Sequence, residues 1–433
     1  MKKIVILDFG AHETQFVARR LRENAVYCEV LPCNIKIATL WQGLNNAAGI
    51  VLAHPLRGKN APDFDKKILE IKLPFLTVYF DDKKRGGRNV VNLPDMHSKT
   101  AAAELTNFAR KTCGITDRWT GKEILAACVA EAKEQVGKEG RIICALSGGV
   151  DSTVVAALLS KAVGSRLNCI FVDTGLIRLG DKEKVIKVAK KLKFNLKVIE
   201  AEDLFLTRLA GVEDPEQKRK IIGATFIDVF EKEAKQFKNA QFLAQGTIYP
   251  DIVESLSPKG HVIKSHHNVG GLPERMNLKL VEPVKFLFKD EVRVLGRELG
   301  LSDDIVNAHP CPGPALGVRQ LGALTKRDLD TLREADLIVR EELTKAGWYN
   351  KCWQAFAILL PIRSTGIKNA KRTFEKPVCV RVINSVDAMT ADWTRLPYEI
   401  LEKISSRITS EVPGVNRVVY DITPKPPATI EWE

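Results

Sequence analysis

The sequence predicts an α/β protein with two consecutive open parallel-sheet domains and a smaller α+β domain at the C-terminal end. Short apolar runs alternate with helical patterns over residues 2–113, and a second series of this kind starts after Trp119. This alternation is typical of open α/β sheets. A length of 433 residues also exceeds what one compact core usually holds. Just after His309, three prolines prevent helix formation locally and mark a rigid boundary loop: Pro310, Pro312 and Pro314.

These boundaries place the domains at 1–116, 117–308 and 309–433. In the first domain we expect a helix over Glu13–Arg22 and strands at Ile4–Leu7, Gly49–Ala53, Phe75–Tyr79 and Val90–Val91. In the second we expect strands at Arg141–Leu146, Cys169–Val172, Leu196–Ile199 and Gln241–Ala244, and helices that include Thr153–Val163 and Lys182–Leu192. In the third we expect helices at Lys326–Ala346 and Tyr398–Glu411, strands at Val378–Ile383 and Arg417–Ile422, and an extended end, Lys425–Glu433.

Composition excludes several classes of protein. With 45% hydrophobic and 27% charged residues, the chain is not disordered. No apolar run approaches the roughly 20 residues that span a membrane, and Lys2–Phe9 is too short for a secretory signal, so we expect a cytoplasmic protein without a membrane partner. The nine cysteines form no CxxC pair, which argues against a zinc site or disulfide framework. The net charge of +13 suits small phosphorylated substrates, and because the lysines are spread along amphipathic stretches we expect no nucleic-acid partner.

The most informative segment is a glycine-containing loop, Ser147-Gly148-Gly149-Val150-Asp151-Ser152, between a predicted strand and a predicted helix. A helix N-terminus presents free backbone N–H groups that bind anions, and glycines let phosphate oxygens approach the backbone. Hydroxyls from Ser147 and Ser152 add donors, and Asp151 is suited to a Mg²⁺ ion that accompanies phosphates. The alternative is a tight turn in which Asp151 or Ser152 only caps the helix.

The loop is neither the kinase-type GxxxxGK[ST] nor the dinucleotide-type GxGxxG. It resembles the pyrophosphate-binding loop of the N-type ATP pyrophosphatases, which cleave ATP between the α and β phosphates. Later motifs resemble the GMP synthase branch of that family, from Trp119 to the C-terminal end: Phe171–Gly175, Lys218–Gly223, Ala244–Asp251, Lys264–Pro273, Phe288–Val292 and Lys425–Glu433.

The resemblance and the residue types together suggest site residues. For ATP we expect Ser147–Ser152, joined by Asp173 at the end of a strand, by Gly246, and by Lys289 in an apolar stretch. An Asp290-paired surface lysine is an equal alternative for Lys289. The resemblance implies that xanthosine monophosphate (XMP) is bound by Arg219, Lys425, Ile430 and Glu431.

Two of these assignments have alternatives. Arg219 offers the fork that phosphate geometry favours, but a solvated basic helix face would look the same. The pair His266-His267 invites a metal interpretation, yet adjacent side chains point in different directions, so positioning of a substrate loop or simple packing is favoured.

The reaction implied by the resemblance is ATP-dependent adenylation of XMP followed by amination. Two further hypotheses stay open: a different purine-like acceptor, and an inactive nucleotide-binding scaffold. Departures from the family pattern leave room for the first of these, because Cys311 and Ala315 replace a phenylalanine and a glycine, and Ile367–Arg372 lacks the usual Gly-Asp. The family also implies a homodimer.

Residues 1–113 resemble the class I glutamine amidotransferase domain that precedes the synthetase, above all in Ile4–Arg22 and Ala109–Thr120. Such a domain needs a cysteine on a glycine-flanked elbow between a strand and a helix, and a His-x-Glu pair. Here Tyr79 stands at the cysteine position, without a following glycine, while Leu93 and Asp95 replace the histidine and the glutamate.

The segment is also much shorter than in the family, and none of its cysteines has the elbow context: Cys28, Cys33 and Cys113. We therefore predict that this chain does not hydrolyse glutamine. Ammonia would come from solution or from a separate glutaminase subunit.

Overall fold

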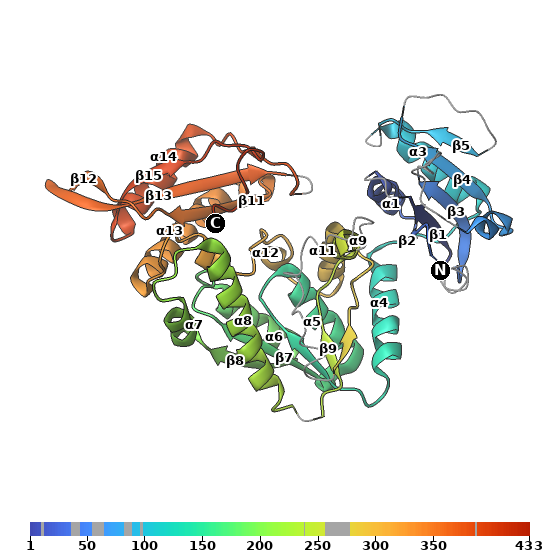
Figure 1. The fold of residues 1–433 in the computed structure, drawn as a ribbon, viewed down its shortest axis with the longest axis horizontal. Coiled ribbons are helices and arrows are strands. Elements are labelled where there is room, and N and C mark those ends of the chain that lie inside the picture. The colour runs from blue at the N-terminus through green and yellow to red at the C-terminus, as the bar shows by residue number, and fades with distance from the viewer. Residues whose placement is uncertain are drawn as a thin grey trace. The chain divides into compact units, whose positions relative to one another are not determined.

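The computed structural model describes residues 1–9, 13–35, 44–53, 65–81, 89–95, 98–237, 239–255, 278–385 and 388–433. The motif Lys264–Pro273, with its histidine pair, lies outside these residues. The chain forms two compact units (Figure 1). The first contains residues 1–128, 247–265 and 284–298, and the second contains 129–246, 266–283 and 299–433.

The first unit is built on a parallel sheet in the order β2-β1-β3-β4-β5. Its strands are β1 (Lys3–Asp8), β2 (Cys28–Pro32), β3 (Ala47–Ala53), β4 (Phe75–Tyr79) and β5 (Val90–Asn92). The other elements are α1 (Thr14–Glu23), η1 (Lys66–Glu70), α3 (Lys99–Asn107), η2 (Phe108–Thr112), α9 (Tyr249–Ser255), α11 (Lys289–Glu298) and the first half of α4 (Gly121–Val136).

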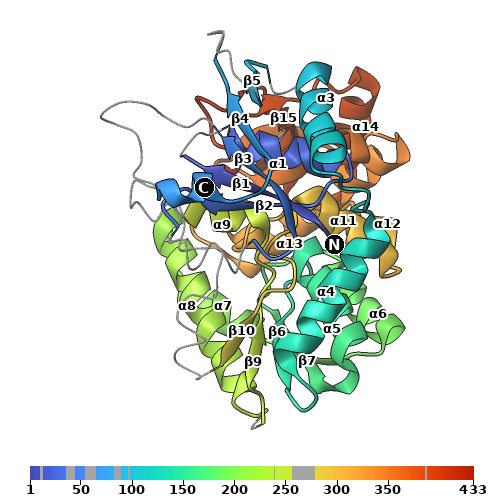
Figure 2. The same cartoon turned by 90° about the vertical axis from the view of Figure 1, so that its right-hand side faces the viewer.

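Strand alternation explains why both faces of this sheet are buried. Ile4 and Ile6 of β1 pack in a cluster with Val17 and Leu21 of α1 and with residues of α3, while Val5 and Leu7 pack on the other side with Ile68 of η1. Figure 2 shows α1 and α3 with the strands of this sheet. The predicted strands and the helix of this region are thus confirmed, with bounds that differ by at most two residues.

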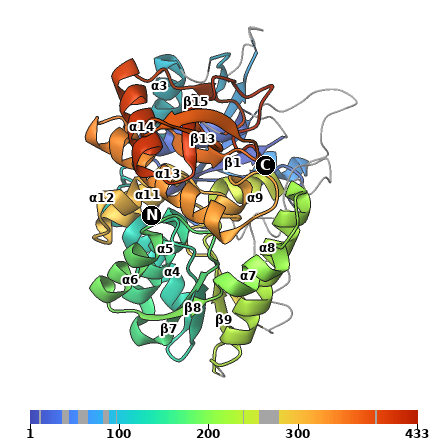
Figure 3. The same cartoon turned by 90° about the vertical axis from the view of Figure 1, so that its left-hand side faces the viewer.

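The second unit contains another parallel sheet, in the order β10-β9-β6-β7-β8. Its strands are β6 (Ile142–Ala145), β7 (Leu167–Asp173), β8 (Asn195–Glu200), β9 (Phe242–Ala244) and β10 (Lys279–Val281). Its helices are α5 (Val150–Val163), α6 (Asp181–Leu192), α7 (Glu202–Leu209) and α8 (Pro215–Ala234), with η3 (Gly164–Arg166) after α5. Right-handed crossovers put α5 and α6 on one face and α8 on the other, as Figure 3 shows.

The same unit continues into a mixed sheet, in which β11 (Gln354–Leu359) and β12 (Ser364–Lys368) pair antiparallel with β13 (Lys371–Asn384), and β15 (Val415–Tyr420) pairs parallel. The short β14 (Asp392–Trp393) extends it. Before the sheet lie α12 (Asp303–Val306), η4 (Ala315–Val318), α13 (Lys326–Lys345) and η5 (Tyr349–Lys351), and α14 (Tyr398–Glu411) precedes β15. Apolar residues of α13 and α14 pack against the strands in one cluster.

The α/β fold class with a C-terminal α+β region is therefore confirmed. The sequence did not indicate β2, β10, β11, β14 or the β12 hairpin, and β13 is more than twice as long as expected. Within the described part of the chain, no helix combines the length and the apolar character needed to cross a membrane.

Candidate nucleotide-binding site

The glycine-containing loop lies where the order of the second sheet reverses. From β6 the chain proceeds outward through β7 and β8, whereas β9 and β10 add on the opposite side of β6. Ligands of open α/β sheets bind at the carboxyl ends of the strands at such a switch point. Residues 146–149 follow β6 at this position and lead into α5.

The serine hydroxyls of the loop accept two of its backbone N–H groups: that of Ser147 donates to Ser152 at 3.2 Å, and that of Gly149 donates to Ser147 at 3.3 Å. Because α5 begins at Val150, the N–H groups of its first turn have no acceptor inside the helix. Gly149 precedes the helix without a side-chain cap, and its carbonyl accepts from the Thr153 hydroxyl at 2.8 Å. The Ser147 and Ser152 hydroxyls lie 3.0 Å apart and hold the two ends of the loop together.

Two glycines allow this conformation and its packing. Gly148 has φ +79°, in the left-handed region, and a Cβ there would lie 3.1 Å from Cγ2 of Val185. Gly246, two residues after β9, packs on the first turn of α5, since a Cβ on it would lie 3.4 Å from the Cβ of Asp151 and the nitrogen of Ser152. The structure therefore brings Ser147–Ser152 and Gly246 together.

The end of β7 contributes Asp173, whose two carboxylate oxygens have different partners. Oδ1 accepts the Gly175 N–H at 3.0 Å, and Oδ2 lies 3.2 Å from Nζ of Lys182. Lys289 opens α11 in the other compact unit. Its assignment to the ATP phosphates stays a prediction.

A magnesium ion fits this site only together with a nucleotide. Among the described residues, no three His, Cys, Asp or Glu side chains are grouped as metal ligands. Asp151, in the first turn of α5, supplies one carboxylate beside the phosphate loop. Mg²⁺ is commonly held by one or two carboxylates plus substrate phosphates, which matches this donor set.

Three buried cations hold the C-terminal segment Lys425–Glu433 against the rest of the second unit. Arg381, fully buried in β13, donates to the carbonyl oxygens of Thr429 at 2.8 Å and Ile430 at 2.9 Å. Arg319 forms a two-pronged ion pair with Glu431, with both distances 2.9 Å. Lys218 of α8, also fully buried, pairs with the side chain of Glu433.

The four residues that the sequence predicts to bind XMP lie on this docked segment or near it. Arg219 donates to the main-chain oxygen of Glu433. The Ile430 side chain packs on Phe356 and Ile358 of β11. Lys425 donates to the Ala388 carbonyl at 2.8 Å, and Glu431 lies on Arg319. Arg219, Ile430 and Glu431 therefore all take part in the contacts that hold the docked segment in place. Lys425 contacts a neighbouring loop at Ala388 instead.

Comparisons with known proteins identify the family. Residues 341–432 match the GMP synthase C-terminal domain, and residues 124–223 match NAD synthase. A GMP synthase [glutamine-hydrolyzing] from Elusimicrobium minutum is 52% identical over 513 aligned positions, which cover 100% of both chains. One from Oleidesulfovibrio alaskensis is 43% identical and covers 100% of this chain and 99% of its own. This chain belongs to the GMP synthase family.

A solved NMN synthetase from Francisella tularensis also matches, with 16% identity, a TM-score of 0.36, and coverage of 54% of this chain and 93% of its own. Membership of the GMP synthase family makes the chain an ATP-dependent ligase. The phosphate loop of the pyrophosphatase class and the docked C-terminal segment are consistent with that.

In the amidotransferase-like region, the structure brings the predicted degenerate positions side by side. Tyr79 ends β4 and pairs with Asn92 of β5, and the Leu93 N–H donates to the Tyr79 carbonyl at 2.7 Å. Both side chains are buried, at 5% and 4% exposure. The Asp95 carbonyl accepts from the Ser98 hydroxyl at 2.7 Å, at the start of α3. A phenolic and an aliphatic side chain thus occupy the ends of two adjacent parallel strands.

Three thiols of the amidotransferase-like region have raised pKa values. Burial raises the pKa of Cys28 to about 11 and that of Cys113 to about 12, and it raises the pKa of Cys33 as well. A nucleophilic cysteine needs the opposite shift, because the thiolate is the reactive form. None of these three thiols has the properties of a replacement nucleophile.

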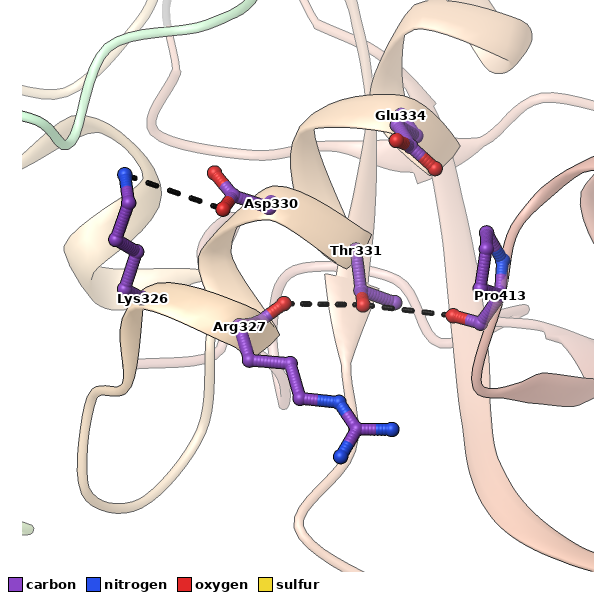
Figure 4. A pocket seen from close by; sticks show the side chains of 6 residues that line it. All are labelled: Lys326, Arg327, Asp330, Thr331, Glu334 and Pro413. Atoms are coloured by element: carbon purple, nitrogen blue, oxygen red, sulfur yellow. Dashed lines mark hydrogen bonds and ion pairs between the residues drawn. The ribbon is translucent and has the colours of Figure 1, made fainter.

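A surface depression elsewhere contains none of the predicted site residues (Figure 4). Its volume is about 460 Å³, and it is lined by Lys326, Arg327, Asp330, Thr331 and Glu334 of α13 and by Pro413. Lys326 pairs with Glu202 at 2.6 Å and lies 4.0 Å from Asp330. The mixed charges of this depression do not favour a phosphorylated ligand.

Sequence reasoning missed the buried cations Lys218, Arg319 and Arg381 and the amide of Gln354. Lys218 belongs to the motif Lys218–Gly223, but the family resemblance points to its neighbour Arg219. Charged residues are rarely buried unless paired, and the partners of these cations lie at least 40 residues away in the sequence. Only tertiary contacts identify them.

Proposed function

We propose that the protein converts XMP, ATP and ammonia into GMP, AMP and pyrophosphate. The observation that carries the proposal is the intact phosphate loop at the switch point of the second sheet, in the same compact unit as the docked C-terminal segment. The relatives from Elusimicrobium minutum and Oleidesulfovibrio alaskensis, both named as GMP synthases, support the same reaction.

In the first step, the 2-oxygen of the xanthine ring attacks the α-phosphorus of ATP, and the bond to the bridging oxygen of pyrophosphate breaks. The N–H groups of the first turn of α5 and the hydroxyls of Ser147 and Ser152 would stabilise the charge on the leaving pyrophosphate. Asp151 would hold the Mg²⁺ that accompanies it. Asp173, fixed through both oxygens, would accept a hydrogen bond from the adenosine.

In the second step, ammonia adds at C2, and AMP leaves with the former 2-oxygen while a proton is released. The protein mainly has to align two nucleotides, which is worth a large part of the rate enhancement without covalent catalysis. Arg219, Lys425, Ile430 and Glu431 would hold the XMP. Contacts of all four with the docked segment or its neighbouring loop support this assignment.

We further infer that the chain lacks glutaminase activity, although its relatives are named as glutamine-hydrolysing. Tyr79 and Leu93 meet where a cysteine and a histidine would be required, and the neighbouring thiols have raised pKa values. The alignment with the Elusimicrobium minutum protein spans 513 positions against 433 residues, so that relative contains positions that this chain lacks. Ammonia would come from solution or from a separate glutaminase subunit.

The experiment compares ammonium chloride with glutamine as the nitrogen source, using purified protein with ATP, Mg²⁺ and XMP. We expect GMP, identified by mass, and pyrophosphate with ammonium only. The Elusimicrobium minutum relative, assayed in parallel, controls for the quality of the glutamine assay. Glutamate release from glutamine by this chain would refute the loss of glutaminase activity, and absence of pyrophosphate in every condition would refute the synthetase.

We also propose that the chain has three domains, at residues 1–116, 117–308 and 309–433, and that two copies form a homodimer. Each of the three parts contains one of the three sheets. The hairpin of β12 and β13 exposes apolar side chains that a second copy would cover: Ile367 at 77%, Phe374 at 61% and the nearby Ile362 at 60%. The size of the protein by sedimentation would test the dimer.

A different purine-like acceptor is the second candidate, and two loops favour it. Ala315 has φ +50° at the position where the family pattern has glycine, and Ala370 has φ +60° in the turn between β12 and β13. Cys311 is exposed where the pattern has phenylalanine. Pyrophosphate release with another purine nucleotide but not with XMP would select this alternative.

A further inference from the structure

The loop between β7 and α6, residues 174–180, begins directly after Asp173. It lies at the carboxyl end of the second sheet, where ligands of open α/β proteins bind. Asp173 and this loop are connected, because the Gly175 N–H donates to Oδ1 of Asp173 at 3.0 Å. The conformation of the β7–α6 loop therefore helps to set the orientation of this carboxylate.

One arginine of α13 contacts two carbonyl oxygens of the β7–α6 loop. Nη2 of Arg333 donates to the Gly175 carbonyl, and Nε donates to the Ile177 carbonyl at 3.4 Å. Nη1 pairs with Asp330, one turn earlier on α13, and the arginine side chain is only 13% exposed. The guanidinium thus joins α13 to a loop that lies 158 and 156 residues earlier in the sequence at these two contacts.

Two further contacts hold the β7–α6 loop against the same part of the chain. The Leu316 N–H, in η4, donates to the Leu176 carbonyl at 2.9 Å, and Arg340 of α13 donates to the Leu179 carbonyl at 3.1 Å. The Leu176 side chain is fully buried, in one cluster with apolar residues of α13. Four of the five carbonyls of residues 175–179 therefore accept from η4 or α13.

Gly175 depends on these contacts, because a glycine does not hold one conformation by itself. Its φ is +70°, and a Cβ on it would lie 2.3 Å from Cγ of Glu202. The Glu202 carboxylate pairs with Lys326 of α13 at 2.6 Å and lies 3.8 Å from Nη2 of Arg333. A side chain that would restrict the torsions of Gly175 thus has no room, and its neighbours have to fix them.

We propose that Arg333 is a positioning residue for ATP. It holds the Gly175 carbonyl, and the Gly175 N–H in turn orients the Asp173 carboxylate that accepts from the adenosine. The inference rests on the proposed function, because the role of Asp173 in ATP binding is part of it. Arg333 acts through the β7–α6 loop and does not touch the nucleotide.

The test measures binding of α,β-methylene-ATP, an analogue that cannot release pyrophosphate, by calorimetry, together with KM for ATP and for XMP. Arg333→Met should raise the dissociation constant of the analogue and KM for ATP by about 10-fold or more, as expected for the loss of a hydrogen bond from a charged group. KM for XMP should stay within about twofold. Arg333→Lys keeps the charge but not the fork, so part of the affinity should return.

Arg407→Met is the matched control for lost stability. Arg407 of α14 pairs with Glu341 and Glu342 of α13, at 2.8 and 2.7 Å, so its loss weakens the contacts of the same helix without touching the β7–α6 loop. Affinity for the analogue should stay within about twofold of the wild type. A loss as large as in Arg333→Met would show that a loosened α13 is sufficient, and would overturn the inference.

A double-mutant cycle tests the path through Asp173. If Arg333 acts by orienting Asp173, then adding Arg333→Met to Asp173→Ala raises the dissociation constant of the analogue by less than about twofold further. Multiplicative effects, or wild-type affinity in Arg333→Met, would refute the positioning role. A wild-type protein that binds the analogue but does not turn over XMP would refute the proposed reaction, while the binding data would still decide the role of Arg333. A wild-type protein that does not bind the analogue would refute both.

Discussion

Gly149→Ala tests whether the loop before α5 is a phosphate site. The substitution adds one methyl group at φ −72° and ψ 163°, a conformation that alanine adopts readily. Its nearest neighbour would be the Ser147 hydroxyl at 3.4 Å, an ordinary contact. The loss of stability should be at most about 1 kcal/mol, because glycine caps helices somewhat better than alanine does.

The effect on ATP should be much larger. The methyl group would occupy the concavity where phosphate oxygens must approach several backbone N–H groups. Loss of one preorganised donor of this kind costs about 10²- to 10³-fold, so we expect at least a 100-fold fall in kcat/KM for ATP. The assays are pyrophosphate release with XMP and ammonium, and urea unfolding to measure stability.

Gly137→Ala is the matched control. Gly137 has φ +69° with no neighbouring atom within 4 Å of an added Cβ. Alanine there should cost about 1 to 2 kcal/mol of stability through backbone strain and leave pyrophosphate release unchanged. Near-normal pyrophosphate release by Gly149→Ala would refute the phosphate site and leave the loop as a simple turn.

Three further predictions concern stability. Arg22→Met should cost the first unit about 3 to 5 kcal/mol in urea unfolding, because it leaves Glu291 buried without its ion pair at 2.7 Å, whereas Arg19→Met, at an exposed pair, should cost less than about 1 kcal/mol. Burial raises the pKa of Cys28 from 9.0 to about 11, so the stability from its neutral form is complete below pH 9 and is lost as pH rises toward 11, at up to about 1.4 kcal/mol per pH unit. Unfolding at pH 8 and 10 should show this loss, and Cys28→Ala should reduce it. Ala370→Gly should stabilise the protein by up to about 1 kcal/mol, because its φ of +60° favours glycine, and an unchanged urea midpoint would contradict this.

Much of the fold and of the predicted ATP site follows from local patterns. The alternation of apolar runs with helical stretches predicted both parallel sheets, and the strand bounds differ by two residues or fewer in most cases. The loop Ser147–Ser152 was recognisable because anion binding at a helix N-terminus depends on consecutive backbone groups. The order of residues along the chain is therefore enough to recognise such a loop.

The hairpin of β12 and β13 was not predictable, because no local pattern in the sequence indicates it. Its paired residues, Ser364–Lys368 and Lys371–Glu375, are mostly polar and half-buried or exposed, and their pairing depends on a turn in which Ala370 takes a positive φ. The placement of Glu431 depends likewise on Arg319 and Gln354, which lie 112 and 77 residues away. Tertiary folding alone brings such groups together.

The sequence by itself determined the fold class and supplied two predictions, a phosphate loop at Ser147–Ser152 and the replacement of a cysteine and a histidine by Tyr79 and Leu93. All of these depend on residue type and short-range order. Only the tertiary structure decided which cations are buried and which carboxylates they hold, because the energy of a buried ion pair depends on distance and exposure and not on separation along the chain. The ion pairs of Lys218 with Glu433 and of Arg319 with Glu431 exist for that reason only in the folded protein.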